Sequence, residues 1–283
     1  STTIVATTAR APILKGIEAY RLKREHEDGL LRRVEGRFDT APFGIHHLVL
    51  AADQFVVRRP LLATHTAEHA GEAQGQSVIA GYPWFGDWGR DTMISLPGLT
   101  LTTGREDVAA SILRTFAHYL DQGMLPNRFP DAGEEPEYNT VDATLWYFEA
   151  IRAYHEATGD DALVRELWEA LTEIVAWHRR GTRYGIRVDE TDGLLRAGEE
   201  GVQLTWMDAK VDDWVVTARI GKPVEINALW YNALRIMAGL ARRLGETATR
   251  YEEMAALAAD GFGRFWNHAR GYCYDVIDGP EGN

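Results

Sequence analysis

Aromatic and charged side chains alternate in one short stretch of the chain, Gly81-Tyr-Pro-Trp-Phe-Gly-Asp-Trp-Gly-Arg-Asp-Thr92. Its three glycines and one proline argue against a regular helix or strand, so we predict a loop. The rings would offer a flat apolar surface to the C–H face of a sugar, while the acids and the arginine would bind its hydroxyls. A buried structural loop with a satisfied Arg–Asp pair is the alternative, and this stretch alone does not separate the two.

Within this stretch we expect four side chains to contact a sugar. Trp84 would stack on the ring, and Asp87 would accept hydroxyl hydrogen bonds. Arg90 and Asp91 are better placed as a clamp on ring hydroxyls than as proton donors, because an Arg–Asp fork is firmly ionised.

A second stretch, Gln203-Leu-Thr-Trp-Met-Asp-Ala-Lys210, places a carboxyl group among apolar neighbours. Cleavage of a glycosidic bond needs an acid to protonate the leaving oxygen and a second carboxylate across the sugar, roughly 6.5–9.5 Å away in inverting enzymes. We choose Asp208 as the acid, because apolar surroundings raise the pKa of a carboxyl group, although Lys210 would lower it. A structural ion pair between Asp208 and Lys210 remains the open alternative.

Other candidate sugar ligands lie in loops or at predicted helix starts. Each of them has a simpler explanation in helix capping, ion pairing or core packing. They are Asn127, Asn139, Asp142, Trp146, Trp206, Lys210 and Glu225, with Lys222 as a neighbour that could touch substrate or merely satisfy a helix end.

No metal or organic cofactor is expected. His65 and His69 have the spacing of metal ligands on a helix, but Gly71 and Gly75 argue against a helix there. Such two-residue matches also arise by chance. Cys273, as a single cysteine, excludes an internal disulfide and any cysteine-built metal site.

The composition is that of an ordinary globular protein, with 283 residues, 45% hydrophobic and 25% charged. A net charge of −12 would repel DNA and RNA, whereas a neutral glucan is indifferent to it. No apolar run reaches the roughly 18–20 residues of a membrane helix, and the start of the chain does not look like a signal peptide. We therefore expect a cytoplasmic protein that binds neither nucleic acid nor membrane. The first residue is not methionine, which favours a piece excised from a longer chain.

The elements that must position these side chains are mostly helices, because apolar residues recur at helical spacing along much of the chain. We predict about eight, over 12–34, from Pro42, over 93–103 with a break near Pro97, over 105–122, from 139 or 140 to 158, over 160–180, from Pro223, and over 251–266. Asp91 or Thr92 would cap the third helix, and Asp160 would cap the sixth. Asp192-Gly193 indicates a hairpin turn, and the last thirteen residues look like a second hairpin that is cut at its turn. Short connections favour antiparallel pairs, and closing such pairs into a ring would gather helix N-termini at one rim.

Five segments in this order resemble the amylo-α-1,6-glucosidase domain of glycogen debranching enzymes of the bacterial and archaeal type. The resemblance covers about residues 40 to 283. The segments are Gly81–Thr92, Pro-Asn-Arg-Phe129, Tyr-Asn-Thr-Val-Asp-Ala-Thr-Leu-Trp-Tyr147, Leu-Thr-Trp-Met-Asp-Ala-Lys210 and Lys-Pro-Val-Glu-Ile-Asn-Ala-Leu-Trp-Tyr231.

The resemblance implies an all-α fold, an (α/α)6 barrel similar to glucoamylase, which inverts configuration. The implied reaction releases the single glucose left at an α-1,6 branch point of glycogen or another branched α-glucan. The family's general acid resembles Asp208, and Arg90 with Asp91 resembles its clamp on the terminal glucose. The general base would be a glutamate beyond Asn283, so the barrel would be incomplete in this chain.

The same resemblance divides the chain into residues 1–40, the end of a preceding domain and a linker helix, and residues 41–283, the N-terminal two-thirds or so of the hydrolase domain. Two other functions stay open at this point. One is a different (α/α)6 glucosidase, related to glucoamylase or trehalase, and the other is a fragment that binds glucan without cleaving it.

Overall fold

The computed structural model describes residues 16–38, 44–61, 74–130, 135–280 and 282. Within these ranges the chain forms eight α-helices, in line with the all-α prediction. They are α1 (Gly16–Arg33), α2 (Ile45–Gln54), α3 (Gly89–Leu96), α4 (Glu106–His118), α5 (Asp142–Thr158), α6 (Asp161–Arg180), α7 (Val224–Leu244) and α8 (Thr249–Phe262).

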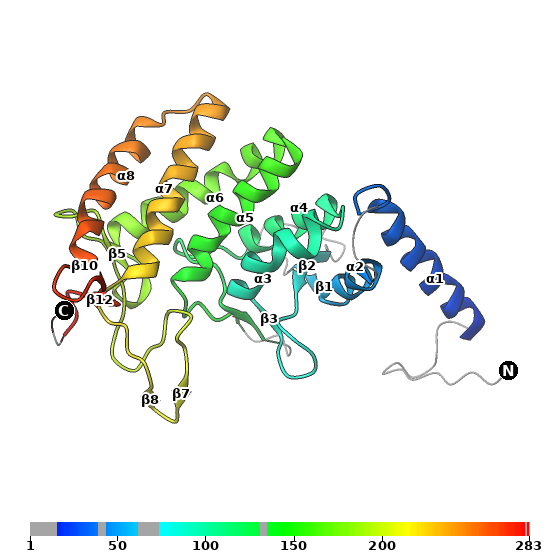
Figure 1. Ribbon diagram of the computed structural model, residues 1–283, viewed down its shortest axis with the longest axis horizontal. Coiled ribbons are helices and arrows are strands. Elements are labelled where there is room, and N and C mark those ends of the chain that lie inside the picture. The colour runs from blue at the N-terminus through cyan, green and yellow to red at the C-terminus, as the bar shows by residue number, and fades with distance from the viewer. Residues whose placement is uncertain (1–15, 39–43, 62–73, 131–134, 281, 283) are drawn as a thin grey trace, which may run out of the picture.

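The helices from α3 to α8 form a curved array of antiparallel pairs (Figure 1). Helix α5 packs against both α3 and α7, while α4 and α6 contact each other and α8 packs along α7. Helices α5 and α7 both begin at the lower edge of the array in Figure 1. The sequence predicts such antiparallel pairs, in which one row of helices shares a direction. Closure of the pairs into a ring stays a prediction.

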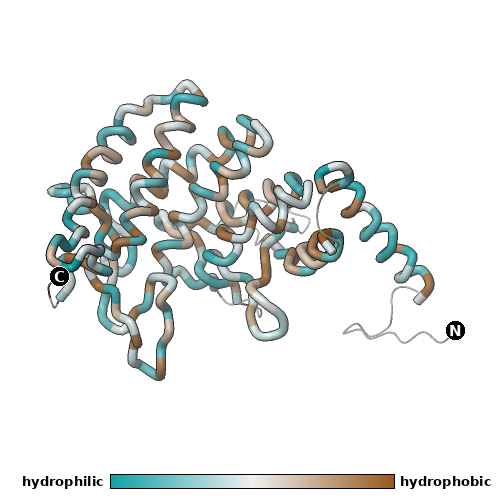
Figure 2. Tube along the Cα trace, viewed as in Figure 1, coloured by the Kyte–Doolittle hydropathy of each residue, from teal (hydrophilic) through white to brown (hydrophobic). Residues whose placement is uncertain are grey.

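The core lies between the helices of this array. Apolar residues at helical spacing alternate with polar ones from α4 to α8, whereas α1 is hydrophilic along most of its length (Figure 2). The largest fully buried side chains include Trp230, Tyr147 and Phe116, from three different helices or hairpins. Burying each such ring stabilises the fold by roughly 1.5–3 kcal/mol, so packing between helices supplies the core.

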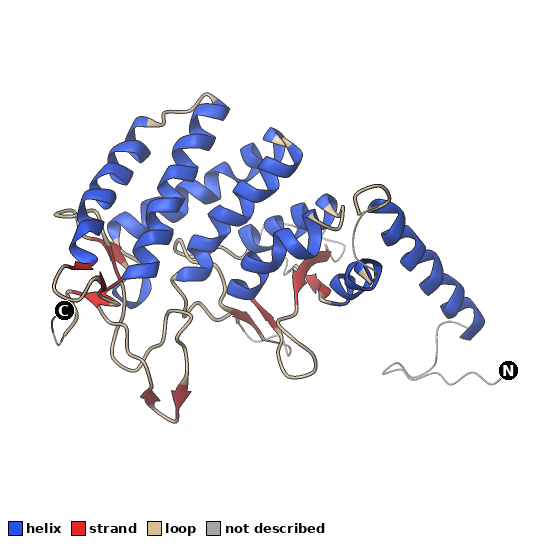
Figure 3. Cartoon of the chain, in the orientation of Figure 1, coloured by secondary structure: helices blue, strands red, loops and turns tan. Residues whose placement is uncertain are grey.

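The described part of the chain has twelve short strands, which pair two by two and lie toward one end of the helical array (Figure 3). All pairs are antiparallel: β1 (Val56–Pro60) with β2 (Gln74–Val78), β3 (Asp87–Trp88) with β4 (Arg128–Phe129), β5 (Arg187–Val188) with β6 (Leu195–Arg196), β7 (Lys210–Val211) with β8 (Trp214–Val215), β9 (Lys222–Pro223) with β12 (Val276–Ile277), and β10 (Trp266–Asn267) with β11 (Tyr272–Cys273). These strands fix the loops between helices at the end where α5 and α7 begin.

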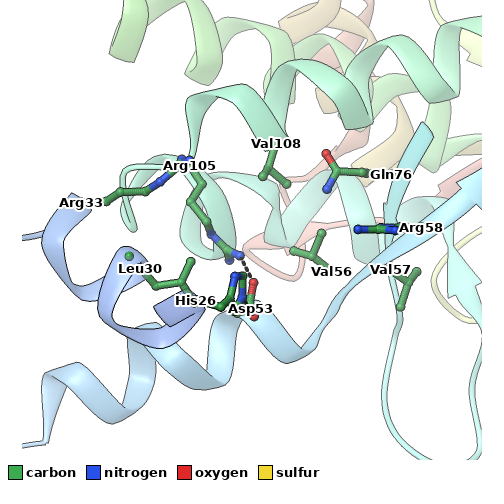
Figure 4. A pocket seen from close by; sticks show the side chains of 11 residues that line it. His26, Leu30, Arg33, Asp53, Val56, Val57, Arg58, Gln76, Arg105 and Val108 are labelled. Carbon is green, nitrogen blue, oxygen red and sulfur yellow. Dashed lines mark hydrogen bonds and ion pairs between the residues drawn. The ribbon is translucent and has the colours of Figure 1, made fainter. Parts of the chain in front are cut away.

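Helix α1 is joined to the array largely by polar contacts. His26 Nε2 lies 2.7 Å from Asp53 Oδ2, and Arg105 Nη1 donates to Asp53 Oδ1 at 2.8 Å. Arg33 reaches Asp107 on α4 at 2.6 Å. Of these groups, His26, Arg33, Asp53 and Arg105 line a pocket of about 440 Å³ between α1, α2, β1 and α4 (Figure 4). The small apolar cluster beside it consists of Leu30, Val34 and Val49. The division of the chain near residue 40 stays a prediction.

Several local predictions are confirmed. Asp160 caps α6, because its Oδ1 accepts the amide hydrogens of Ala162 at 3.0 Å and Leu163 at 3.1 Å. Asp192-Gly193 forms the turn between β5 and β6, with Gly193 at φ 70°. Near Pro97 the α-helix ends and one turn of π-helix, Pro97–Leu101, follows.

Other local predictions are wrong. Helix α3 begins at Gly89 with Trp88 as its N-cap, so Asp91 lies inside the first turn and caps nothing. The polar segment 65–77 predicts a surface loop, whereas residues 74–77 belong to strand β2. The strand predicted for the cut C-terminal hairpin is divided into two short strands, of which β11 pairs with β10 and β12 pairs with β9. The predictions for residues 1–10 and for His65 and His69 fall outside the described residues.

Gly89 is required because the backbone of another segment passes directly over it. A Cβ added there would lie 2.2 Å from the carbonyl oxygen of Pro126, and the Gly89 amide already donates to the Asn127 carbonyl at 2.8 Å. We expect Gly89→Ala to lower the free energy of unfolding by about 1–3 kcal/mol, because the two backbones must separate. Urea denaturation measures it.

Gly239→Ala is the matched control for this substitution. Gly239 lies inside α7, and a Cβ added there would meet nothing within 4 Å. Alanine there should stabilise the protein by up to about 1 kcal/mol, because glycine is costly inside a helix. Equal effects of the two alanines would contradict the close-approach explanation for Gly89.

Candidate active site

Three helices of one row begin side by side, and each brings a charged residue in its first turn. Arg90 is the second residue of α3, Asp142 the first of α5 and Glu225 the second of α7. Because α5 packs against both neighbours, the three starts lie together. The positive ends of three helix dipoles therefore face one region, which favours carboxylates and electron-rich oxygens there.

Arg90 connects two carboxylates from distant parts of the chain. Its Nε and Nη2 donate to the two oxygens of Asp142 at 2.7 and 3.0 Å, and its Nη1 donates to Asp208 Oδ2 at 3.1 Å. Thr140 donates its hydroxyl to Asp142 Oδ1 at 2.7 Å. The Asp142 side chain is only 3% exposed, so it holds Arg90 in place and offers little surface to a sugar.

Asp208 is the accessible acid of this group. Its side chain is 42% exposed and meets Arg90 through one oxygen, which leaves the other free for a ligand. Lys210 instead donates to the carbonyl of Gly201 at 3.2 Å, so the alternative ion pair between Asp208 and Lys210 does not form. The neighbouring Trp206 is 56% exposed. The apolar surroundings expected for Asp208 are therefore open to solvent at Trp206, and only a bound ligand would close them.

Asp91 lies at the edge of a pocket of about 350 Å³ beside Arg90. The residue is exposed, yet nearby protein atoms desolvate its carboxyl group and raise its pKa. Arg90 opposes this rise, and the charges of Asp208 and Asp142 add to it. Because the Asp91 carboxylate makes no hydrogen bond to another described residue, it is available to sugar hydroxyls. The pocket is otherwise mainly apolar, with Phe55, Val78, Ile79, Ala80, Ile94 and Leu99.

Glu225 is held from the opposite side by Arg219, which donates to its Oε2. Its other oxygen is buried and has no hydrogen-bond partner in the described part of the chain. Burial raises the pKa of Glu225, Arg219 lowers it, and the negative charge of Asp142 raises it further. Because the charge of Asp142 raises the pKa of Glu225, the two carboxylates lie close enough to interact.

The structure separates Asp87 from this group. Its carboxylate is 3% exposed and paired with Arg59, whose Nε donates to Oδ2 at 2.6 Å and whose Nη2 contacts Oδ1. The Arg59 guanidinium also covers the ring of Phe129, 4.5 Å from its centroid. The prediction that Asp87 binds sugar is not supported by this placement; it anchors the start of α3 to strand β1.

Asn127 is buried, whereas Asn139 and Trp146 are half-buried. Asn127 is 4% exposed and donates its amide hydrogen to Asn139 Oδ1 at 3.1 Å, and Asn139 is half-buried. Trp146 packs against the main core. For Asn127 and Trp146 the structural explanation is the stronger one, while the half-buried amide of Asn139 remains a candidate contact.

Two loops with exposed aromatic rings project from the end of the array at which α5 and α7 begin (Figure 1). One carries Trp84, which is 84% exposed, and the other is the β7–β8 hairpin with Trp214, 64% exposed. Such rings are costly in water, so they indicate surfaces that a ligand covers. Trp214 was not predicted, because its short hairpin carries no strong turn signal.

The described residues contain no group of three or more His, Cys, Asp or Glu side chains arranged to hold a metal ion. Nor does this part of the chain include a helix whose length and hydrophobicity would let it span a membrane.

Comparison with known proteins identifies the family. Residues 50–282 match the family amylo-alpha-1,6-glucosidase. The chain belongs to this family. One relative, the glycogen debranching enzyme of Saccharomyces cerevisiae (strain ATCC 204508 / S288c), is 29% identical over an alignment of 220 residues. That alignment covers 57% of this chain and 14% of the yeast protein, so the chain spans only a small part of that relative.

A solved structure shares the helical fold of this chain. It is a rhamnosidase from Klebsiella oxytoca with rhamnose bound, and it aligns with a TM-score of 0.50 and 17% identity. The match covers 66% of this chain and 34% of the rhamnosidase. At this identity it supports the fold and carries no information about the substrate.

Proposed function

We propose that this chain belongs to the catalytic domain of a glycoside hydrolase that releases glucose from α-1,6 branch points of glycogen-like glucans. Its family membership supports this reaction class. The observation that carries the proposal is the contact between Arg90 and Asp208 at the starts of α3, α5 and α7. It joins a hydroxyl-binding fork and an accessible acid in one place.

In this proposal Asp208 is the general acid of an inverting mechanism. Its carboxyl proton passes to the glycosidic oxygen as the bond from that oxygen to C1 breaks. A water molecule, deprotonated by a second carboxylate, attacks C1 from the opposite face. That base would be a glutamate beyond Asn283. Arg90 and Asp91 would hold the terminal glucose, with Glu225 and Asn139 as further contacts and Trp84 and Trp206 as stacking surfaces.

The partner of this site would be a branched α-glucan in the cytoplasm, and the reaction would need no cofactor. The exposed rings and the uncharged character of glucans fit a protein of net charge −12, which would repel nucleic acids.

The test is glucose release by the longest natural polypeptide that contains this sequence. A phosphorylase-treated limit dextrin, a linear α-1,4 glucan and trehalose are compared as substrates. Release from the limit dextrin alone, with β-glucose as the first product by NMR, supports the proposal. Preference for either other substrate would favour a glucoamylase- or trehalase-like enzyme, and calorimetric binding without turnover would favour a glucan-binding fragment.

Arg90→Lys tests the fork within this site. Lysine keeps the charge but cannot donate to both oxygens of Asp142 and also to Asp208. We expect kcat/KM for the limit dextrin to fall by about 10-fold to 100-fold, or about 1.4–2.7 kcal/mol of transition-state stabilisation.

Arg114→Lys is the matched control, because Arg114 also forms a forked pair, with Glu166 at 2.7 and 2.8 Å, but on an exposed surface between α4 and α6. That substitution should leave kcat/KM within about twofold. Similar losses in both variants would count against a specific role for Arg90.

A further inference from the structure

Arg219 is a buried cation below the loop that carries Asp208. It lies between β8 and β9, and its side chain is 6% exposed. Its Nη1 is 3.5 Å from the sulfur of Met207, and its Nη2 donates to Glu225 and to the backbone carbonyl of Asp275 at 3.2 Å. One guanidinium thus connects three segments: the residue preceding Asp208, the first turn of α7 and the segment before β12.

The Asp208 loop has few other supports. Residues 202–209 have no helix or strand. The Leu204 carbonyl accepts the Val141 amide hydrogen at 2.9 Å, and Ala209 accepts that of Val216 at 3.1 Å. Between these two points Met207 rests on Arg219, and Asp208 meets Arg90. The position of the acid therefore depends on side-chain contacts made on its two sides.

We propose that Arg219 is a positioning residue that holds the Asp208 carboxyl group at the glycosidic oxygen. This inference rests on the proposed function and goes beyond the roles assigned above. Arg219 does not touch the substrate; it acts through Met207 and through the paired Glu225. A shift of the acid by about 1 Å would slow proton transfer by up to about 100-fold, because the transfer needs hydrogen-bond distance.

Arginine is needed here for its shape. The planar guanidinium reaches a sulfur, a carboxylate and a carbonyl in three directions, whereas a lysine ammonium is a point charge on a flexible stem. Its charge also balances that of Glu225, which is largely buried. Glutamine would lose both the charge and the fork, while lysine would lose only the fork.

The experiment compares two substrates that differ in their need for an acid. With the limit dextrin, the leaving group is an alcohol of the remaining glucan, and its oxygen needs a proton. With α-glucosyl fluoride, the leaving group is a fluoride ion, which needs none. The enzyme is the longest natural polypeptide that contains this chain. With Arg219→Gln we expect kcat on the dextrin to fall about 30-fold to 100-fold with KM within about threefold, and less than about threefold loss on the fluoride.

Arg219→Lys should recover less than half of this loss in free energy, and Arg235→Gln, an exposed arginine on α7, should have no effect. Equal losses on both substrates would overturn the inference, as would a loss confined to KM. If Arg219→Gln shows no cooperative thermal transition, the same comparison of substrates decides with Arg219→Lys. A wild-type protein that releases no glucose from either substrate contradicts the proposed function, and wild-type turnover with equal losses in the variant contradicts only the role of Arg219.

Discussion

Asp208→Asn is expected to lower turnover of a limit dextrin by about 10³-fold to 10⁴-fold, because asparagine occupies nearly the same space but has no proton to give the leaving oxygen. The Arg90 contact can persist through the amide oxygen, so the change is chemical rather than structural. The thermal midpoint should stay within a few degrees of wild type, because Asp208 is 42% exposed and meets only one described cation. Stopped assays of glucose release give the rate.

Asp212→Asn is the matched control, since Asp212 is exposed at the tip of the β7–β8 hairpin. Its positive φ of 51° suits asparagine as well as aspartate. This variant removes the same charge four residues away and should keep at least half of the wild-type rate. Near-normal turnover by Asp208→Asn would remove Asp208 from the acid role, and the exposed Asp91 would be tested next.

Lys222→Met is expected to lower the free energy of unfolding by about 3–5 kcal/mol, since it removes a buried cation shared by three carboxylates. Asp192 and Asp278 keep Arg264 as a partner, whereas Asp189 loses its described cation. The Lys222 side chain is 2% exposed, and its Nζ lies 2.8 Å from carboxylate oxygens of Asp189, Asp192 and Asp278. Burial opposes its charge, but the hydrogen bonds that Lys222 donates to these three carboxylates raise its pKa. Lys222 therefore ties the β5–β6 turn to the end of β12, a structural role in place of the substrate contact considered from the sequence.

The pH dependence of this loss has a definite sign. Hydrogen bonds from Lys222 and Thr191 lower the pKa of Asp189, and those from Arg264 and Lys222 lower that of Asp278. A lowered folded-state pKa contributes stability above the ordinary carboxyl pKa of about 4, and that contribution is lost as the pH falls below it. The gap between wild type and Lys222→Met should therefore be widest near pH 7 and shrink toward pH 3.

Urea denaturation at pH 7, 5 and 3.5 measures this gap. Lys210→Met, which changes an exposed lysine of the β7–β8 hairpin, should cost less than about 0.5 kcal/mol at every pH. A pH-independent gap would show that packing around the lysine stem, rather than its charge, accounts for the loss.

The parts of the fold that follow from local chemistry could be predicted from the sequence. Asp160 begins α6 because its side chain caps the amides that follow it, and Gly159 and Gly245 end α5 and α7 in the left-handed conformation. The start of α6 and the turn at Asp192-Gly193 rest on contacts between residues a few positions apart. The (α/α)6 closure involves contacts at long sequence separation, and the array from α3 to α8 leaves it a prediction.

In the candidate site, too, contacts between distant residues could not be predicted from the sequence. Asp87 and Arg90 stand three positions apart in one aromatic stretch, and nothing local distinguishes their roles. Asp87 is occupied by Arg59, 28 positions away, whereas Arg90 is aimed by Asp142, 52 positions away. Arg219 was missed for the same reason, since its partner Asp275 lies 56 positions along the chain. Sequence spacing therefore predicts the neighbourhood of the candidate site but not which charges are already paired.

The contact of Arg90 with Asp208 spans 118 positions, and the residues around it come from the starts of three successive helical hairpins. No single hairpin contains two of the three residues Arg90, Asp142 and Asp208. Closing so long a loop costs entropy that is recovered only when α3, α5 and α7 have docked, so the site is completed late in folding. Heating should accordingly abolish catalysis together with the cooperative melting of the helices, rather than through earlier fraying of one catalytic loop.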